Sequence, residues 1–79
     1  MAKHDLKLNT KYFDDVMYGF KKFEVRFNDR GFQSGDILNL REWDGEKYTG
    51  RELEAYVDYF VDLGEIGLKD WVAMGIEIG

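Results

Sequence analysis

Residues 19–26 read Gly-Phe-Lys-Lys-Phe-Glu-Val-Arg, and they predict a strand that starts directly after a turn. From residue 22 to residue 27, apolar and charged side chains alternate with the period of two that is typical of a half-buried strand. Glu24 and Arg26 are expected to share the solvated face, about 7 Å apart along the strand. The apolar side chains, which we expect to enter the core, are Phe23, Val25 and Phe27.

An amphipathic helix is predicted just before this strand. Its apolar stripe has the spacing i, i+3, i+4, i+7 and consists of Phe13, Val16, Met17 and Phe20. Asn9 or Thr10 can cap the start of the helix, because their side-chain oxygens accept hydrogen bonds from the first free backbone amides. Gly19 is the natural stop. A short alternating strand over residues 4–8 is expected before the helix.

A hairpin is predicted near the middle of the chain. Residues 37–43 alternate, with Leu38 and Leu40 expected to face the core. Asp44-Gly45 favours a type I′ turn, since both residues tolerate a positive φ, and the chain would return through residues 48–51.

The last third of the chain predicts two more strands, over residues 52–61 and 71–78, joined by a loop over residues 62–70. The expected inward side chains are Leu53, Ala55, Val57, Tyr59, Val61, Val72, Met74, Ile76 and Ile78. The whole pattern predicts a mostly β (α+β) fold of about five or six short, mainly antiparallel strands with one packed N-terminal helix. Closing such a sheet into a small β-barrel protects its edges. At 79 residues, the chain is expected to be a single domain, residues 1–79.

Composition excludes several classes of site. The chain has no cysteine and one histidine, His4, so we expect no disulfide, no metal site and no cofactor. No apolar run approaches the roughly 20 residues of a membrane helix, and the charged N-terminus lacks a signal peptide. The sequence therefore predicts a soluble, cytoplasmic protein without a membrane partner.

Charge is distributed unevenly along the chain, whose net charge is −5. Residues 1–34 carry seven Lys/Arg against five Asp/Glu, giving +2, and residues 35–79 carry four against eleven, giving −7. Bulk attraction to nucleic acid is therefore not expected. A local anion-binding site would lie in the first half.

The motif Gly19-x-Lys21-x-x-Glu24-x-Arg26 resembles the signature of ASCH domains (activating-signal-cointegrator homology), a branch of the PUA-like fold. Other stretches are similar to small bacterial and phage-associated ASCH-like proteins, namely His4–Leu8, Asn28–Arg30, Gly35–Leu38 and Leu40–Glu42. The resemblance implies a PUA-like β-barrel with a cleft beside the helix that binds RNA or a nucleotide. It points to Gly19, Lys21, Glu24 and Arg26 as ligand-binding residues. Lys22, Arg30 and Arg41 could extend a basic rim for phosphate, so the expected binding set also includes Lys22 and Arg30.

An enzyme is the first alternative. Some ASCH relatives hydrolyse the exocyclic amide of acylated cytidine nucleosides, or RNA, and the amidohydrolases use a lysine, a threonine and a glutamate. Lys21 matches that lysine, whereas Glu24 stands where the threonine would be. In a hydrolase Lys21 would be the activated amine and Glu24 the general base, with Asp58 or Asp62 as candidates for a more distant acid.

Other interpretations need no ligand. The charged motif can be an ordinary surface ion pair, and Arg41 an ordinary solvated charge. The aromatic residues Trp43, Tyr48, Tyr56 and Trp71 can stack on a base or simply pack within the fold. His4 is expected to be a surface or partly buried residue. A protein-interaction domain, as a monomer or a homodimer, is the second alternative.

Overall fold

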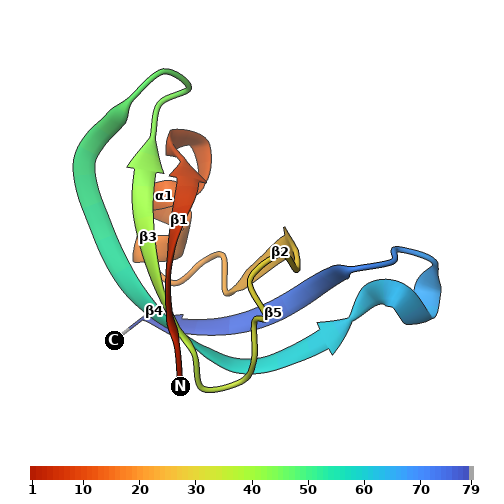
Figure 1. Ribbon diagram of the computed structural model, residues 1–79. Coiled ribbons are helices and arrows are strands. Elements are labelled where there is room, and N and C mark those ends of the chain that lie inside the picture. Colours follow the sequence, from red (N-terminus) through yellow and green to blue (C-terminus); the bar gives the residue numbers. More distant parts are fainter. Residues whose placement is uncertain (79) are drawn as a thin grey trace.

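The computed structural model describes residues 1–78, which form a five-stranded mixed sheet bent into a half-barrel with one α-helix (Figure 1). The elements in chain order are β1 (Lys3–Asn9), α1 (Thr10–Met17), β2 (Phe23–Phe27), β3 (Ile37–Trp43), β4 (Tyr48–Asp62), the 3₁₀ helix η1 (Leu63–Ile66) and β5 (Trp71–Ile78). The strand order is β1-β3-β4-β5-β2, with β1 parallel to β3 and the other pairs antiparallel. The predicted small, mostly β fold with one helix is confirmed, with β1 and β2 as the two edges of the sheet.

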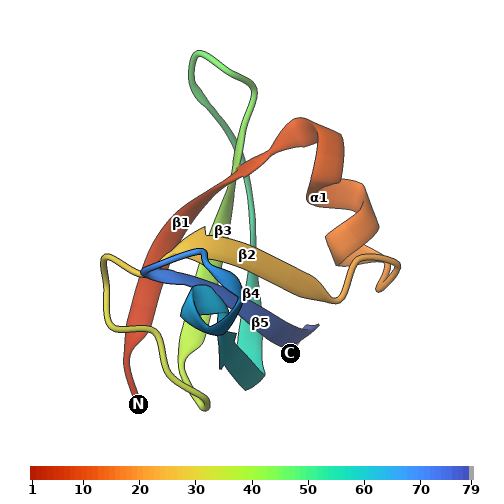
Figure 2. The ribbon, with the colours of Figure 1, turned by 90° about the vertical axis from the view of Figure 1, so that its right-hand side faces the viewer.

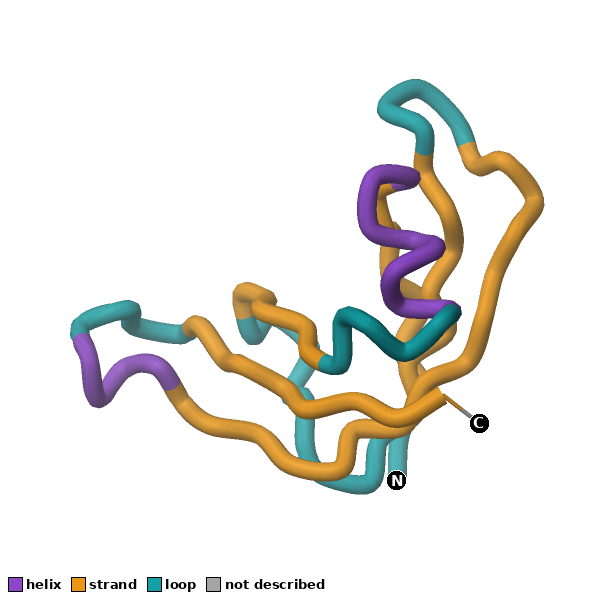
Figure 3. The backbone as a smooth tube through the Cα atoms, turned by 180° about the vertical axis from the view of Figure 1, so that it is seen from behind, coloured by secondary structure: helices purple, strands orange, loops and turns teal. Residues whose placement is uncertain are grey.

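The sheet bends so sharply that it has two arms. One arm holds β1, β3 and the first part of β4, and the other holds the last part of β4 with β5 and β2 (Figure 1). Figure 3 shows α1 within the angle between the arms. Figure 2 views this concave side, where β2 runs beneath α1. The concave side therefore holds the core, together with the space between the two edges.

The core of the first arm follows the predicted alternation. Leu6 and Leu8 of β1 and Leu38 and Leu40 of β3 are all buried. Each pair lies two residues apart and so points to one face of its strand. The intervening side chains are polar and face outward, which is why the sequence was sufficient to orient these strands.

Helix α1 ends before the last residue of the apolar stripe that the sequence predicts. Asn9 caps it, accepting a hydrogen bond from the Lys11 backbone N–H at 2.8 Å. Phe13 is buried against the sheet, but Phe20 lies beyond the helix and is 82% exposed, so its predicted place in the stripe is wrong. The helix ends early because Gly19, at φ 80°, turns the backbone into the left-handed region. Within residues 1–78, no helix has the length and apolar character needed to cross a membrane.

Strand β2 has the predicted alternation but the opposite orientation. Glu24 is 4% exposed and faces the concave side, whereas Phe23, Val25 and Phe27 are 53%, 46% and 49% exposed on the outer face. The prediction that the apolar set enters the core is therefore wrong. Period two establishes that neighbours point to opposite faces, but it does not establish which face is covered.

The β3–β4 hairpin differs from the prediction in two ways. The segments expected at residues 48–51 and 52–61 are one continuous strand, β4. The turn is not type I′, since Gly45 takes a positive φ but Asp44 does not. Instead the Asp44 carboxylate accepts hydrogen bonds from the backbone N–H groups of Glu46 and Lys47, at 2.8 and 2.9 Å. These bonds lower the pKa of Asp44.

A β-bulge at Asp58 reverses the alternation of β4. Val57 pairs with Ile76 and Tyr59 with Gly75, so two steps on β4 match one step on β5. Tyr59 and Val61 are consequently exposed, and their predicted inward orientation is wrong. Ile78, also predicted to face inward, is likewise exposed.

A buried carboxylate, Glu42, joins the hairpin to α1. Arg51 donates to it through Nε at 2.9 Å and Nη2 at 2.8 Å, and the Thr49 hydroxyl donates a further bond. The same guanidinium pairs with Asp14 of α1 at 3.1 Å and lies 4.5 Å from the centroid of the Phe13 ring. The bonds from Arg51 and Thr49 lower the pKa of Glu42 to about 2.

This pKa predicts a specific acid sensitivity. Because the pKa of folded Glu42 lies below its ordinary value of 4.5, the stabilisation is complete above that value. It is lost as the pH falls toward about 2. In urea unfolding at a series of pH values, wild type should be more stable than Glu42→Gln near neutrality. The difference should disappear as the pH falls through this range, and a difference independent of pH would contradict the assignment.

Candidate functional site

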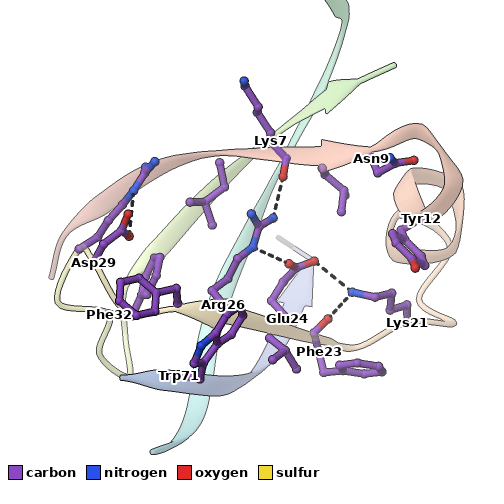
Figure 4. A pocket seen from close by; sticks show the side chains of 15 residues that line it. Lys7, Asn9, Tyr12, Lys21, Phe23, Glu24, Arg26, Asp29, Phe32 and Trp71 are labelled. Carbon is purple, nitrogen blue, oxygen red and sulfur yellow. Dashed lines mark hydrogen bonds and ion pairs between the residues drawn. The ribbon is translucent and has the colours of Figure 1, made fainter. Parts of the chain in front are cut away.

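A cavity of about 600 Å³ lies between the two edge strands, β1 and β2 (Figure 4). It is lined by Leu6, Lys7, Leu8, Asn9, Tyr12, Lys21, Phe23, Glu24, Val25, Arg26, Phe27, Asp29, Arg30, Phe32 and Trp71. Its volume is in the range of small-ligand sites. It occurs here because the half-barrel leaves these two strands unpaired with each other.

Glu24 is the centre of the polar side of the cavity. One carboxylate oxygen accepts a hydrogen bond from Lys21 Nζ at 3.1 Å, and the other accepts from Arg26 Nε at 3.0 Å (Figure 4). Lys21 also donates to the Phe23 carbonyl at 2.7 Å. The carboxylate thus fixes two cations at one wall of the cavity. The motif in the sequence is a three-residue ion cluster facing inward, not a solvated surface pair.

Two arginines bridge the gap between the edges. Arg26 Nη2 donates to the Lys7 carbonyl of β1 at 2.7 Å, and Arg30 donates to the Asp5 carbonyl of the same strand. Edge strands present unpaired carbonyls, and here guanidinium groups satisfy two of them. Side chains therefore hold β2 to β1 where no backbone ladder does, and the cavity between the strands stays open.

Donors remain available to a ligand. Among residues 1–78, Arg26 Nη1 makes no hydrogen bond, and the Lys21 ammonium has three N–H donors but two partners. The Lys7 ammonium points away from the cavity and lies 3.9 Å from the centroid of Trp43 (Figure 4). Three cationic side chains therefore serve the cavity, Lys21, Arg26 and Arg30, against the two carboxylates of Glu24 and Asp29.

Aromatic side chains border the charged wall. The Tyr12 ring is partly exposed, and its centroid lies 5.4 Å from Lys21 Nζ. Trp71 of β5 lies at the rim of the cavity, packed edge to face on Phe27, and Phe32 is buried at its boundary. A flat ring system could stack on Tyr12 while its polar edge meets Lys21 or Arg26.

The structure brings together four of the six residues in the expected binding set: Lys21, Glu24, Arg26 and Arg30. Gly19 and Lys22 line a separate hollow of about 290 Å³ beside the end of α1. Of the aromatic candidates, Trp71 borders the cavity, whereas Trp43 and Tyr48 pack edge to face across the hairpin, with centroids 5.1 Å apart.

The remaining candidates lie elsewhere. Asp62 caps η1, accepting from the Gly64 N–H at 2.8 Å, and Asp58 lies at the bulge. His4 is partly buried, as expected, and its Nε2 lies 2.9 Å from Asp36 Oδ2. Burial alone would raise the pKa of Asp36, but hydrogen bonds from the Ala2 N–H, the His4 ring and the Gln33 N–H lower it. Within residues 1–78, no cluster of three or more His, Asp or Glu side chains could hold a metal.

Sequence reasoning missed three contributors to the cavity: the side chains of Asn9 and Tyr12 and the backbone carbonyl of Lys7. Tyr12 lies outside the apolar stripe of α1, which is a detectable signal for an aromatic residue that faces something other than the core. The Lys7 carbonyl has no signal in the sequence, because its availability depends on which strand forms the edge of the sheet.

Comparison with known proteins identifies a structure with the same fold, a relative in sequence and the family of this chain. The crystal structure of hypothetical protein PH0355 superposes with a TM-score of 0.66 over 100% of both chains at 19% identity, which shows a shared fold. The uncharacterized 12.9 kDa protein in the GpA 3′ region of Escherichia phage P2 is 44% identical over 75 residues, covering 94% of this chain and 68% of that protein. Residues 3–76 match the family model described as Domain of unknown function (DUF3850), and the chain therefore belongs to that family.

Proposed function

We propose that this protein binds RNA or a nucleotide-like ligand in the cavity between β1 and β2. The observation that carries the proposal is the wall formed by Lys21 and Arg26, which Glu24 holds in place inside a cavity of about 600 Å³. Charge-assisted donors at a concave site suit a phosphate group or the edge of a base.

Local charge supports the proposal more than overall charge does. Three cationic side chains against two carboxylates make the cavity positive, although the chain carries −5. Such a protein would repel long stretches of phosphate backbone and still accept one or a few nucleotides. Tyr12 adds a ring on which a base can stack, a contact worth about 1–3 kcal/mol.

The wider relationship fits this activity. We propose that the family is a branch of the ASCH group within the PUA-like fold, on the motif from Gly19 to Arg26 and the half-barrel. We also place the activity in the cytoplasm, since a chain without cysteine suits a reducing compartment.

The geometry favours binding over hydrolysis. Each oxygen of Glu24 accepts a hydrogen bond from a cation, which is the arrangement of a carboxylate that positions two cations. Lys21 donates to that carboxylate and to a carbonyl, which is the arrangement of a positioned ammonium group. Turnover of N4-acylcytidine or RNA by the purified protein, lost in Glu24→Ala, would reverse this preference.

Titration of fluorescent short RNAs and nucleotides tests the proposal. Wild type should bind, and Lys21→Met and Arg26→Met should each weaken binding about tenfold to a hundredfold, the value of one charge-assisted hydrogen bond. The Met side chains retain apolar bulk and remove the charge. Binding should also weaken as salt is raised.

Arg41→Met is the matched control, because Arg41 pairs with Glu52 on the outer face, away from the cavity. It removes the same charge and should leave affinity within about twofold. The proposal fails if no ligand of either class binds, or if all four proteins bind equally.

A further inference from the structure

The two arms of the sheet have outer faces of opposite character. On the first arm the outer face is charged: Lys3 pairs with Glu54 at 3.0 Å, and Arg41 pairs with Glu52 at 3.6 Å. Asn39 also lies there, donating to Asp5 and Glu52. This is the ordinary composition of a sheet face in contact with water.

The outer face of the second arm is apolar across three strands. Between β2 and β5, the register aligns Phe23 with Gly75, Val25 with Ala73 and Phe27 with Trp71. On the other side of β5, Tyr59 and Val61 of β4 align with the same Gly75 and Ala73. Directly opposed residues of antiparallel strands point to the same side. The apolar face therefore consists of Phe23, Val25, Phe27, Tyr59, Val61, Trp71, Ala73 and Gly75.

The large side chains of the apolar face are well exposed, between 40% and 69%. An aromatic side chain carries about 150–250 Å² of buriable area, so four that are about half exposed, with two valines, offer about 500 Å². A contiguous apolar patch of this size matches the largest patch on a typical monomer, which is often functional. Two such patches facing each other bury about 1,000 Å², the lower limit for a specific interface.

We propose that the apolar face is the interface of a homodimer in which two copies pack sheet against sheet. The relief of the face suits a second copy of itself. The side chains of β2 form a ridge, and beside it the short Ala73 leaves a trough, bounded on its far side by Val61 and Tyr59 and at Gly75 by the Asp58 carboxylate. A two-fold axis that lies in the plane of the interface, between β2 and β5 and along the strands, places the ridge of each copy in the trough of the other, as in interdigitated sheet packing.

Charge is compatible with this arrangement. One carboxylate lies on the apolar face, that of Asp58, whose Oδ1 covers Gly75 at 2.6 Å from the position of a Cβ on that residue. The two-fold axis between β2 and β5 keeps the two Asp58 carboxylates on opposite sides of the interface, because β4 lies beyond β5. The eight residues of the face are themselves uncharged, so they need no partner of complementary charge. Each copy carries −5, so raising the salt should strengthen the dimer.

Dimerisation is separate from ligand binding, because alternate residues of β2 serve the two sides. Glu24 and Arg26 face the cavity, whereas Phe23, Val25 and Phe27 face the proposed partner. The dimer therefore does not depend on the proposed ligand. Either could be disproved without the other.

Sedimentation equilibrium across micromolar to millimolar concentrations tests the dimer. Wild type should shift from the monomer mass of 9.3 kDa to twice that mass as concentration rises. Val25→Glu and Val61→Lys, which place charges of opposite sign on two strands of the face, should each raise the dimer dissociation constant at least about tenfold. Both sites are 40–50% exposed, at 46% and 42%, so the variants should fold, as circular dichroism would verify.

Asn39→Lys is the matched control, since it makes the same charge change as Val61→Lys on the charged outer face and should dimerise like wild type. The proposal is overturned if wild type stays monomeric throughout, or if Val25→Glu and Val61→Lys dimerise like wild type. A monomer that instead binds a different protein through this face would also overturn it.

Discussion

Glu24→Ala should destabilise the fold by about 3 kcal/mol in urea unfolding, because it leaves Lys21 and Arg26 beside each other without their shared carboxylate. The Glu24 side chain is 5% exposed, whereas those of Lys21 and Arg26 are 18% and 25% exposed. Water can therefore recover little of the lost interaction. Because β2 is an edge strand held to β1 by Arg26, the loss should also loosen the bridge between the edges.

Two comparisons separate this effect from simple loss of a side chain. Glu54→Ala removes a carboxylate from the exposed pair with Lys3 and should cost less than about 1 kcal/mol. The triple variant with methionine at positions 21, 24 and 26 removes the entire cluster, so it should recover most of the stability lost in Glu24→Ala. Equal losses in Glu24→Ala and Glu54→Ala would show that the inward-facing cluster does not stabilise β2.

Phe13→Ala should cost about 4 kcal/mol, a large share of the stability of a domain of this size. Phe13 is 1% exposed, joins α1 to the core and supports the Arg51 guanidinium that binds Glu42. Truncation would open a cavity and remove the surface on which that guanidinium lies. Thermal and urea unfolding measure the loss.

Phe20→Ala is the matched control, because the sequence pattern puts both phenylalanines on one helical stripe. In the structure Phe20 is 82% exposed beyond the end of α1, so its removal should change stability by less than about 0.5 kcal/mol. Comparable losses in the two variants would mean that α1 extends through Phe20 and packs along its whole stripe.

The strands that the sequence oriented correctly are those with one apolar and one charged side. In β3, Leu38 and Leu40 alternate with Asn39 and Arg41, so a single orientation is favourable. Continuing the same alternation puts Glu42 on the inward side, where the structure has it buried, and this position in phase with the leucines was a readable signal.

Strand β2 could not be oriented by this reasoning, because burial of its apolar side chains competes with burial of the hydrogen-bonded Glu24. Turning the apolar residues inward would expose Glu24, but two cationic donors, Lys21 and Arg26, make a buried Glu24 favourable. Those bonds depend on Lys21 preceding the strand and on a β1 carbonyl brought near by the fold. The alternation of side chains within β2 indicates neither of these contacts. The ion cluster was therefore visible in the sequence as a motif, but its location inside a cavity was not.

The bulge at Asp58 has a consequence for the width of the cavity. The extra residue increases the local twist and bend of β4, the strand that runs through both arms. The bend determines how closely the two ends of the sheet approach each other, and these ends are the walls of the cavity. Insertions or deletions near Asp58 would resize the binding space without altering a residue that lines it. Relatives of this protein could thus accommodate larger or smaller ligands by changing backbone length at a distance, while keeping the same charged wall.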